Sequence, residues 1–423
     1  MADRLVTERD VRERMVPVVL GSDILGYTYV RSFQEAYGLT SIVLATADVK
    51  ATSSSRFCDY RIVDGIDNDQ VLLDYLERLG QELDAQNKVG YLAGSGDWYA
   101  RLLSQNKERL SRYFVVPYID FDLLDKLTQK EYFYQLCESL DIPYPKTWTY
   151  SCAADAPDIP VSDFTYPLIA KPSNSAAYHY AEFAGKKKIF EVETPEELAR
   201  IFAALKQSCY DRELIIQDFI PGEDDGLRSI SIFTDENGDA LMTCCGQVVL
   251  QDHAPQAIGN PVLIVSERAE EPVAHACRLL KSVGYHGFAN FDVKFDPRDG
   301  SYKFFEVNTR PGRNSFYVTL GGVDFVRLMV EDFALGKRLS RVDATDEFAY
   351  ACIPPFVVKK TVKDPALRER ALGLYRSGKA SFPLFYKKDS FAQRFWATLT
   401  YYNQIVKFKK YVWDTNGKQI AFE

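Results

Sequence analysis

Short apolar runs alternate with amphipathic stretches along the first third of the chain. Residues 16–20 and 41–45 are short, mostly apolar runs, and the stretch between them is amphipathic. Runs of this kind are typical of strands buried in a parallel sheet. The pattern repeats more weakly as a helix near 70–82, a strand near 89–93 and a helix near 99–105. We therefore predict a parallel α/β domain over residues 1–122.

The turn after the first predicted strand runs from Gly21 to Gly26 and invites comparison with dinucleotide-binding loops. It lacks the third glycine of the GxGxxG spacing, and no acidic residue clearly closes the second strand. We interpret it as a structural turn rather than a nucleotide site.

Residues 123–340 mix helices with short strands. Helices are predicted at 128–140, 196–205 and 272–284. Two strand-like runs, 287–295 and 302–308, are joined by the polar turn 296–300, which is a strong β-hairpin pattern.

The remaining residues, 341–423, are predicted to form a basic, aromatic helical extension. The chain has a formal net charge of −8, which makes nucleic acid an unexpected partner for the surface as a whole. From 351 to 412, however, there are 13 Lys or Arg against 3 Asp or Glu, so this stretch carries +10 and the rest −18. The extension is thus a basic module on an acidic protein.

One stretch of this extension has apolar residues at helical spacing. They are Phe391, Phe395, Leu399, Tyr402 and Val406, with Lys387, Lys388 and Arg394 before or among them and Lys407, Lys409 and Lys410 at the end. A basic, aromatic helix of this kind can make a peripheral contact with an anionic membrane surface. The alternative, which we favour, is that the apolar residues pack on the protein's own acidic body.

Cysteine spacing and the N-terminus indicate the compartment. The eight cysteines include no CxxC pair and no Cys/His spacing that suits zinc. The first fifteen residues are charged and lack the apolar core of a signal peptide. Nor does any apolar run reach the roughly 20 residues of a membrane span. We expect reduced thiols and a cytoplasmic protein.

The predicted hairpin carries the most informative polar residues. Asp292 lies on its first strand, and Glu306 and Asn308 lie two apart on its second, so they share one face. Oxygen-bearing side chains of this kind suit one or two Mg²⁺ ions, with Mn²⁺ as an alternative, and leave positions for substrate phosphates. Arg310 and Arg313 follow directly, and arginine binds carboxylate or phosphoryl oxygens in a two-pronged fashion. We favour a metal site over an ordinary solvated hairpin.

The run from Asp292 through Glu306 and Asn308 to Arg310 resembles the metal-binding signature of the ATP-grasp superfamily. The resemblance extends from about residue 17 to 337 and implies two α+β lobes that enclose ATP, behind an N-terminal α/β domain. It implies that Lys130 and Lys171 bind the ATP phosphates. The hinge that holds adenine would be Gln217, Asp218, Phe219 and Ile220, and Glu223 or Asp224 would bind the ribose.

Two positions depart from the usual pattern of that superfamily. The loop after Lys171 has few glycines, so Ser173, Asn174 and Ser175 are expected to donate to the phosphates in their place. The hinge opens with Gln217 where a glutamate is frequent. Its carbonyl oxygen can still accept a hydrogen bond from the adenine amino group.

Within the superfamily, the segment from Asn308 to Asn314 is most similar to the D-aspartate ligase-like carboxylate–amine ligases. This resemblance implies an ATP-dependent enzyme that activates a carboxylate as an acyl phosphate. The acyl phosphate would be joined to an amine, for example of a peptide or cell-wall precursor, with release of ADP and phosphate. Arg310 and Arg313 would be the catalytic residues. Two alternatives stay open: a carboxylase component that uses bicarbonate, and a nucleotide-binding interaction protein without turnover. The sequence does not specify an oligomeric state.

Overall fold

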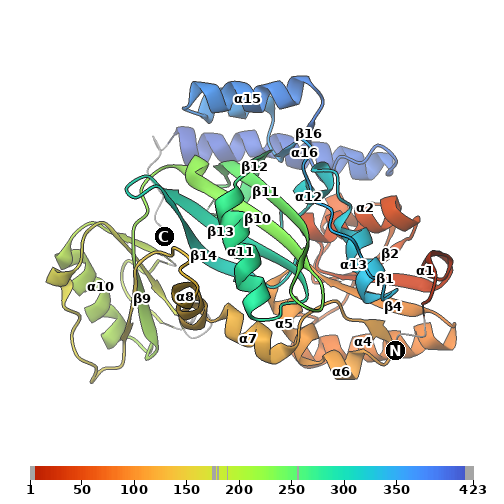
Figure 1. The fold of residues 1–423 in the computed structure, drawn as a ribbon, viewed down its shortest axis with the longest axis horizontal. Coiled ribbons are helices and arrows are strands. Elements are labelled where there is room, and N and C mark those ends of the chain that lie inside the picture. The colour runs from red at the N-terminus through yellow and green to blue at the C-terminus, as the bar shows by residue number, and fades with distance from the viewer. Residues whose placement is uncertain (1–4, 174–177, 179–180, 188, 255–256, 415–423) are drawn as a thin grey trace.

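The apolar runs of the first third of the chain form a parallel sheet, as the sequence predicts. The computed structural model describes residues 5–173, 178, 181–187, 189–254 and 257–414. Its N-terminal sheet has the order β3-β2-β1-β4-β5 (Figure 1). Helices cover both faces, because Val19 packs in the cluster that contains α2, whereas Val18 and Leu20 pack with α4 and α5. The strands are β1 (Met15–Leu20), β2 (Ser41–Ala45), β3 (Cys58–Ile62), β4 (Val89–Gly94) and β5 (Phe114–Val115). The helices are α1 (Glu8–Arg14), α2 (Ile24–Tyr37), α3 (Lys50–Ser53), α4 (Asp69–Ala85), α5 (Asp97–Gln105) and α6 (Lys107–Leu110).

A small antiparallel lobe follows and projects at the left of Figure 1. Its sheet has the order β6-β9-β7-β8, and α10 packs against it through Leu198, Phe202 and Leu205. The strands are β6 (Thr147–Ser151), β7 (Leu168–Pro172), β8 (Phe190–Val192) and β9 (Glu213–Asp218), and the helix is α10 (Pro195–Gln207). Two helices, α7 (Phe121–Thr128) and α8 (Lys130–Ser139), connect this lobe to the N-terminal domain.

A seven-stranded sheet forms the centre of the molecule, with the order β14-β13-β10-β11-β12-β15-β16. Alternate residues of β10 face opposite sides, as the strand period requires. Ile232 packs in the cluster that contains α11, and Phe233 packs in the cluster that contains α13 and α2. The strands are β10 (Leu227–Thr234), β11 (Ala240–Gln251), β12 (Pro261–Ser266), β13 (Gly287–Asp296) and β14 (Ser301–Asn308). The helices are α11 (Glu270–Ser282), α12 (Phe316–Leu320) and α13 (Phe325–Phe333).

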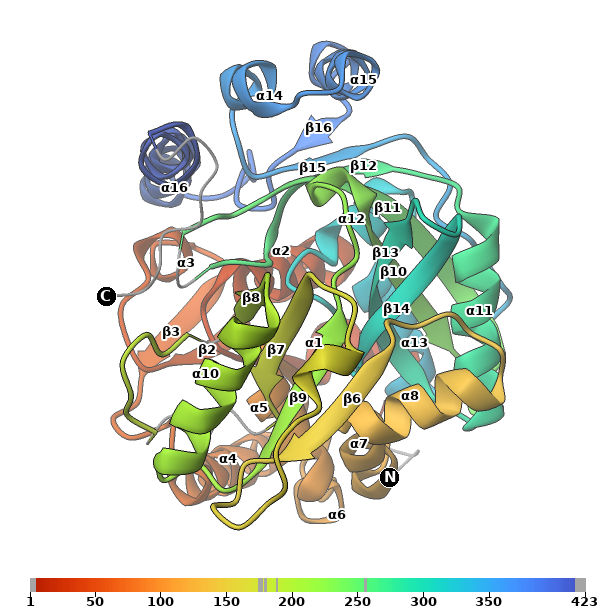
Figure 2. The same ribbon diagram turned by 90° about the vertical axis from the view of Figure 1, so that its left-hand side faces the viewer.

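The C-terminal extension is more closely joined to this sheet than a helical appendage would be. β15 (Ala349–Ala351) pairs with β12, and β16 (Ala380–Ser381) pairs with β15. The helices are α14 (Pro355–Thr361), α15 (Pro365–Arg376) and α16 (Phe391–Phe408), and Figure 2 shows them as an outer layer above the sheet. Both strands are too short to give a hydrophobic period, which is why the sequence does not reveal them.

The apolar residues that the sequence singled out on α16 are exposed instead of packed on the protein, so the interpretation that we favoured for them was wrong. Five residues at helical spacing are exposed, and we call them the apolar stripe: Phe391, Phe395, Leu399, Tyr402 and Val406. The helix packs instead through its opposite face, where Gln393, Ala397, Gln404 and Phe408 are buried. Gln393 satisfies its side-chain nitrogen by donating to the carbonyl of Leu384 at 2.9 Å. Within the described part of the chain, no helix has the length and apolarity to cross a membrane.

Asp389 fixes the start of α16 to the N-terminal domain. Its buried carboxylate accepts hydrogen bonds from the Tyr27 hydroxyl at 2.7 Å, the Ser55 hydroxyl at 2.6 Å and the Arg56 backbone N–H at 3.0 Å. Three donors from two segments of the N-terminal domain thus depend on one side chain that lies more than 300 residues further along the chain.

We predict that Asp389→Ala lowers the free energy of unfolding by about 1–3 kcal/mol, because it leaves buried donors without an acceptor. Urea titration followed by far-UV circular dichroism measures this change. Asp155→Ala, at an exposed acid, is the control and should change stability by less than about 0.5 kcal/mol. Equal stabilities for the two variants would show that Asp389 does not anchor the helix.

Candidate active site

The hairpin of β13 and β14 brings the three predicted metal-binding side chains together. Asp292 lies directly opposite Glu306 in the antiparallel register, next to a bulge between Asp292 and Val293. The Asn308 side-chain nitrogen donates to Asp292 Oδ2 at 3.3 Å. Residues directly opposite in a sheet point to one face, so the sequence prediction of a shared face is confirmed. Their role as metal ligands stays a prediction.

The charges of this cluster fit a divalent cation. Burial and, after it, the neighbouring Glu306 carboxylate together raise the pKa of Asp292 to about 7. Two acidic side chains held together in this way repel each other unless a cation or a proton lies between them. Two carboxylates and one amide are oxygen donors of the kind that Mg²⁺ takes from proteins. Among the described residues, no group of three or more His, Cys, Asp or Glu could hold a metal ion, so this candidate site depends on the Asn308 amide beside its two carboxylates.

The two predicted phosphate lysines lie beside the same cluster. Lys130 begins α8, and its Nζ is 2.9 Å from Glu306 Oε2. Burial acts to lower the pKa of Lys130, but the Glu306 carboxylate and the Tyr134 hydroxyl together outweigh it, so the pKa of Lys130 is raised. Lys130 in turn lowers the pKa of Glu306.

Lys171, on β7, lacks that compensation. Burial and, after it, the nearby Lys130 ammonium together lower the pKa of Lys171 to about 7. Two lysines from different elements therefore converge at a cost in electrostatic free energy. A polyphosphate at this position would remove that cost.

The predicted hinge lies at the end of β9. The side-chain nitrogen of Gln217, which is buried, donates to the Tyr134 hydroxyl at 2.7 Å and to Thr147 Oγ1 at 2.9 Å. Its amide nitrogen is therefore engaged within the protein. Sequence reasoning missed Lys294 of β13, whose Nζ donates to the carbonyl of Ile220 at 2.9 Å and to that of Gly222 at 2.8 Å. Lys294 thereby ties the predicted hinge to the strand that carries Asp292, and its place two residues after Asp292 was the only sequence signal for it.

The two candidate ribose carboxylates differ in their surroundings. Glu223 is exposed, and its Oε1 is 2.6 Å from Lys363 Nζ in the C-terminal extension. Asp224 is more buried and accepts from the Gln251 backbone N–H at 2.9 Å. His253 Nε2 lies 3.2 Å from Asp224, and this hydrogen bond raises the pKa of His253. Asp224 is thus held by its surroundings, whereas Glu223 is paired away from the hinge.

Arg310 and Arg313 extend from β14 toward the N-terminal domain. Arg310 is mostly buried and forms a two-pronged ion pair with the Asp97 carboxylate, with Nε 2.8 Å from Oδ1 and Nη2 2.9 Å from Oδ2. Arg313 Nε lies 3.6 Å from Asp23 Oδ2. Sequence reasoning did not select these two acids, because their arginine partners lie in a distant part of the chain.

Asp23 and Asp97 follow β1 and β4, two parallel strands that lie side by side. From β1 the chain continues to β2 and β3 on one side of this pair, and from β4 it continues to β5 on the other side. The strand order therefore reverses between β1 and β4, and such a topological switch point is where parallel α/β sheets bind ligands. Gly21 has a positive φ of 93°, and a side chain there would meet the Ser95 hydroxyl at 2.1 Å. The turn from Gly21 to Gly26 therefore has the structural role that we expected, and it also positions Asp23.

Ser173 is directed elsewhere, since its hydroxyl donates to Glu213 Oε2 at 2.9 Å. The other two expected donors of this loop, Asn174 and Ser175, lie outside the described residues. The assignment of this loop to the ATP phosphates stays a prediction.

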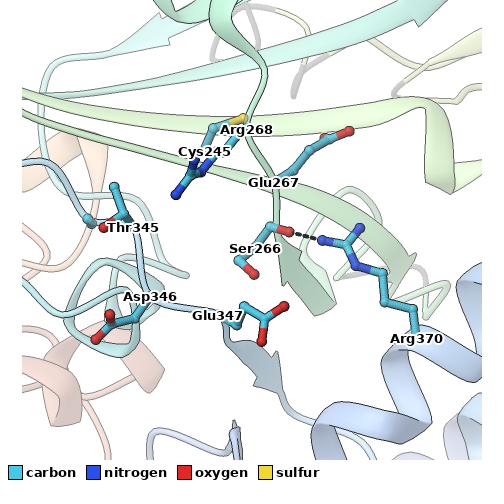
Figure 3. Close-up of a pocket in the computed structure, with 9 residues that line it drawn as sticks. Cys245, Ser266, Glu267, Arg268, Thr345, Asp346, Glu347 and Arg370 are labelled. Atoms are coloured by element: carbon cyan, nitrogen blue, oxygen red, sulfur yellow. Dashed lines mark hydrogen bonds between the residues drawn. The ribbon is translucent and has the colours of Figure 1, made fainter.

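A separate cavity of about 290 Å³ lies between the end of β12 and α15 (Figure 3). Arg370 crosses its edge to donate to the carbonyl of Ser266. None of the predicted site residues lines it, so we assign it no part in the chemistry.

We predict that Glu306→Gln reduces ATP-dependent ADP release by at least about 100-fold while leaving the fold intact, because it removes a charge that faces the candidate metal site and Lys130. Steady-state ADP release at saturating Mg²⁺ measures this effect. Glu347→Gln removes the acid of an exposed ion pair with Lys379 and is the matched control. Near-normal turnover of Glu306→Gln would contradict the metal assignment.

We also predict proton uptake when nucleotide binds. With a pKa of about 7, Lys171 is mostly neutral near pH 8 in the free protein, and bound phosphates favour its charged form. Binding of MgADP near pH 8 should take up as much as about one proton. Near pH 6, Lys171 is already charged, whereas Asp292, with a pKa of about 7, is mostly protonated and should lose its proton when the metal binds, so net release is expected there. Calorimetry in buffers of different ionisation enthalpy measures the uptake. Lys171→Gln should abolish it, and identical binding heats in all buffers would contradict the prediction.

Comparison with known proteins agrees with this geometry. Residues 129–342 match the family described as carbamoyl-phosphate synthase L chain, ATP binding domain. The chain is 36% identical over 409 residues to the D-aspartate ligase of Enterococcus faecium (strain Aus0004), which covers 94% of this chain and 97% of that protein. Among solved structures, biotin carboxylase from Campylobacter jejuni has a TM-score of 0.57 at 14% identity, covering 78% of this chain and 73% of that one. L-amino acid ligase from Bacillus licheniformis has a TM-score of 0.53 at 14% identity, covering 76% and 74%. The chain therefore belongs to the ATP-grasp ligases, in the family of the D-aspartate ligase.

Proposed function

We propose that this protein is an ATP-dependent carboxylate–amine ligase that forms an amide through an acyl phosphate and releases ADP and phosphate. One observation carries the proposal. The segment that follows the Glu306–Asn308 cluster delivers Arg310 and Arg313 to Asp97 and Asp23, at the ligand-binding edge of the N-terminal sheet. A phosphate-binding region and a substrate-binding region are thus joined by a short stretch of chain.

ATP would lie between the small lobe and the seven-stranded sheet, with its phosphates on Lys130 and Lys171. Asp292, Glu306 and Asn308 would hold Mg²⁺, which supplies neutralisation of phosphate charge when bound. Arg310 and Arg313 would exchange their acidic partners for the substrate carboxylate. Positioning and electrostatic stabilisation by these side chains can supply most of the barrier reduction in a phosphoryl transfer.

The reaction then has two bond exchanges. A carboxylate oxygen bonds to the γ-phosphorus as the bond from that phosphorus to ADP breaks, which gives the acyl phosphate. The amine nitrogen next attacks the acyl carbon, and phosphate leaves as the amide forms and the nitrogen loses a proton.

The arrangement of charges supports an amino acid as the carboxylate substrate. An amino acid offers a carboxylate to the arginines and an ammonium group to Asp23 or Asp97. The similarity to D-aspartate ligase over nearly the whole chain favours D-aspartate. We infer that the amine belongs to a peptide or cell-wall precursor.

ADP release tests the proposal. The protein is incubated with ATP, Mg²⁺ and D-aspartate, L-aspartate or bicarbonate, each with and without hydroxylamine as a generic amine. We expect ADP release and hydroxamate formation with an amino acid. Release with bicarbonate alone would indicate a carboxylase component, and nucleotide binding without turnover over a panel of amino acids and peptide amines would indicate an interaction protein.

We predict that Arg313→Lys lowers kcat/KM by at least about tenfold, because lysine cannot make two parallel hydrogen bonds to a carboxylate. The kinetics are measured for both substrates. Arg338→Lys, at an exposed position after α13, is the control for the same chemical change. Unchanged kinetics in Arg313→Lys would show that Arg313 is a surface residue without a catalytic role.

A further inference from the structure

The outer face of α16 is apolar and has no partner within the described part of the chain. Phe391 is 77% exposed, Val406 62% and Tyr402 55%. At about 100° of rotation per residue, the five residues of the apolar stripe cover an arc of about 80°, nearly opposite the buried face of the helix. In Figure 2, α16 is seen end-on at the periphery of the molecule, beside α3. One face of the helix therefore holds it on the protein, and the other is presented outward.

Aromatic exposure is concentrated at this place. Among the described residues, all the exposed Phe, Tyr and Trp side chains lie between residues 356 and 402. Besides those of the stripe, they are Phe356, Phe385 and Trp396. Aromatic side chains on a basic helix are typical of segments that lie at the interface between lipid and water.

The charge around the stripe has a single sign. From residue 390 to 413 the chain contains no Asp or Glu. Arg394, Lys409 and Lys410 are exposed, and Lys387 and Lys388 precede the helix. Lys407 is the exception, since it pairs with Asp252 at 2.8 Å and so holds the helix in place.

We propose that α16 binds the surface of an anionic lipid bilayer, with the apolar stripe in the interface and the basic side chains at the lipid headgroups. The excess positive charge favours an anionic partner. A symmetric dimer through this face is disfavoured, because two-fold symmetry would place basic residues of one copy against those of the other. With 18 residues, α16 is about 27 Å long, and it would lie in the plane of the bilayer. This proposal is independent of the ligase reaction.

Vesicle co-sedimentation of the full chain tests the proposal. Vesicles of phosphatidylcholine with phosphatidylglycerol are compared with vesicles of phosphatidylcholine alone. We expect binding to the anionic vesicles that weakens at least about tenfold at about 0.5 M salt, because salt screens exposed charges. No binding to anionic vesicles at low ionic strength, or equal binding to both kinds of vesicle, would overturn the proposal.

Two double variants separate the apolar and the electrostatic parts. Phe391→Ser with Phe395→Ser removes half-exposed or exposed rings, and Lys409→Glu with Lys410→Glu reverses two charges. Each double variant should reduce vesicle affinity at least about tenfold. For the charge variant the reason is that one basic residue near an anionic surface contributes about fivefold to the affinity; for the aromatic variant it is the loss of two apolar rings from the lipid interface. Unfolding temperature and ADP release in lipid-free buffer should stay unchanged, because these residues lie on the surface and outside the candidate active site.

Matched controls make the same chemical changes elsewhere. Ile62→Ser with Val71→Ser removes exposed apolar side chains from the N-terminal domain, and Lys126→Glu with Arg112→Glu reverses one exposed charge on α7 and one just before β5. Both should retain vesicle binding. If the α16 variants bind as the wild type does, the proposal fails. If light scattering shows a dimer that only the Phe391 and Phe395 variant dissociates, a second copy covers the stripe and the proposal is also overturned.

Discussion

The convergence of like charges on the hairpin of β13 and β14 is the constraint on which the candidate site depends. Asp292 and Glu306 face each other in one register position, and Lys130 and Lys171 approach from the small-lobe side. The pKa of Asp292 is raised and that of Lys171 is lowered, so the surroundings destabilise the charged form of both groups. Only Lys130 and Glu306 compensate each other. A cation and a polyphosphate together would satisfy the remaining charges, which is why the arrangement indicates a site for both.

The same hairpin determines how the domains meet. Because Arg310 and Arg313 follow β14 directly, the register that sets Asn308 beside Asp292 also sends the two arginines to the loops after β1 and β4. Lys294, on the adjacent strand β13, donates hydrogen bonds to the carbonyls of Ile220 and Gly222 in the predicted hinge region. The candidate phosphate, hinge and substrate regions therefore depend on two adjacent strands, and a slip of one residue in the pairing of these strands would displace all three regions.

Local periodicity explains which features the sequence revealed. The period of two and a polar turn predicted the hairpin and the common face of Asp292, Glu306 and Asn308, and the helical period predicted α16. Contacts between distant elements, such as Arg310 with Asp97, leave no such pattern. The face by which α16 packs was misjudged because it is lined by Gln393 and Gln404, which are polar yet buried. The side-chain nitrogen of buried Gln393 donates to the Leu384 carbonyl, and this hydrogen bond cannot be inferred from periodicity.

The pairing of β15 with β12 also bears on how the protein is made. During translation, the central strands emerge from the ribosome before β15 (Ala349–Ala351). Until β15 has emerged, β12 has no partner strand on that side and forms an open edge of the sheet. Unpaired edges are templates for association with other chains. The nascent protein thus passes through a stage at which its largest sheet is unprotected. A chaperone that holds that edge, or slow translation at low temperature, would be expected to improve the yield of folded protein.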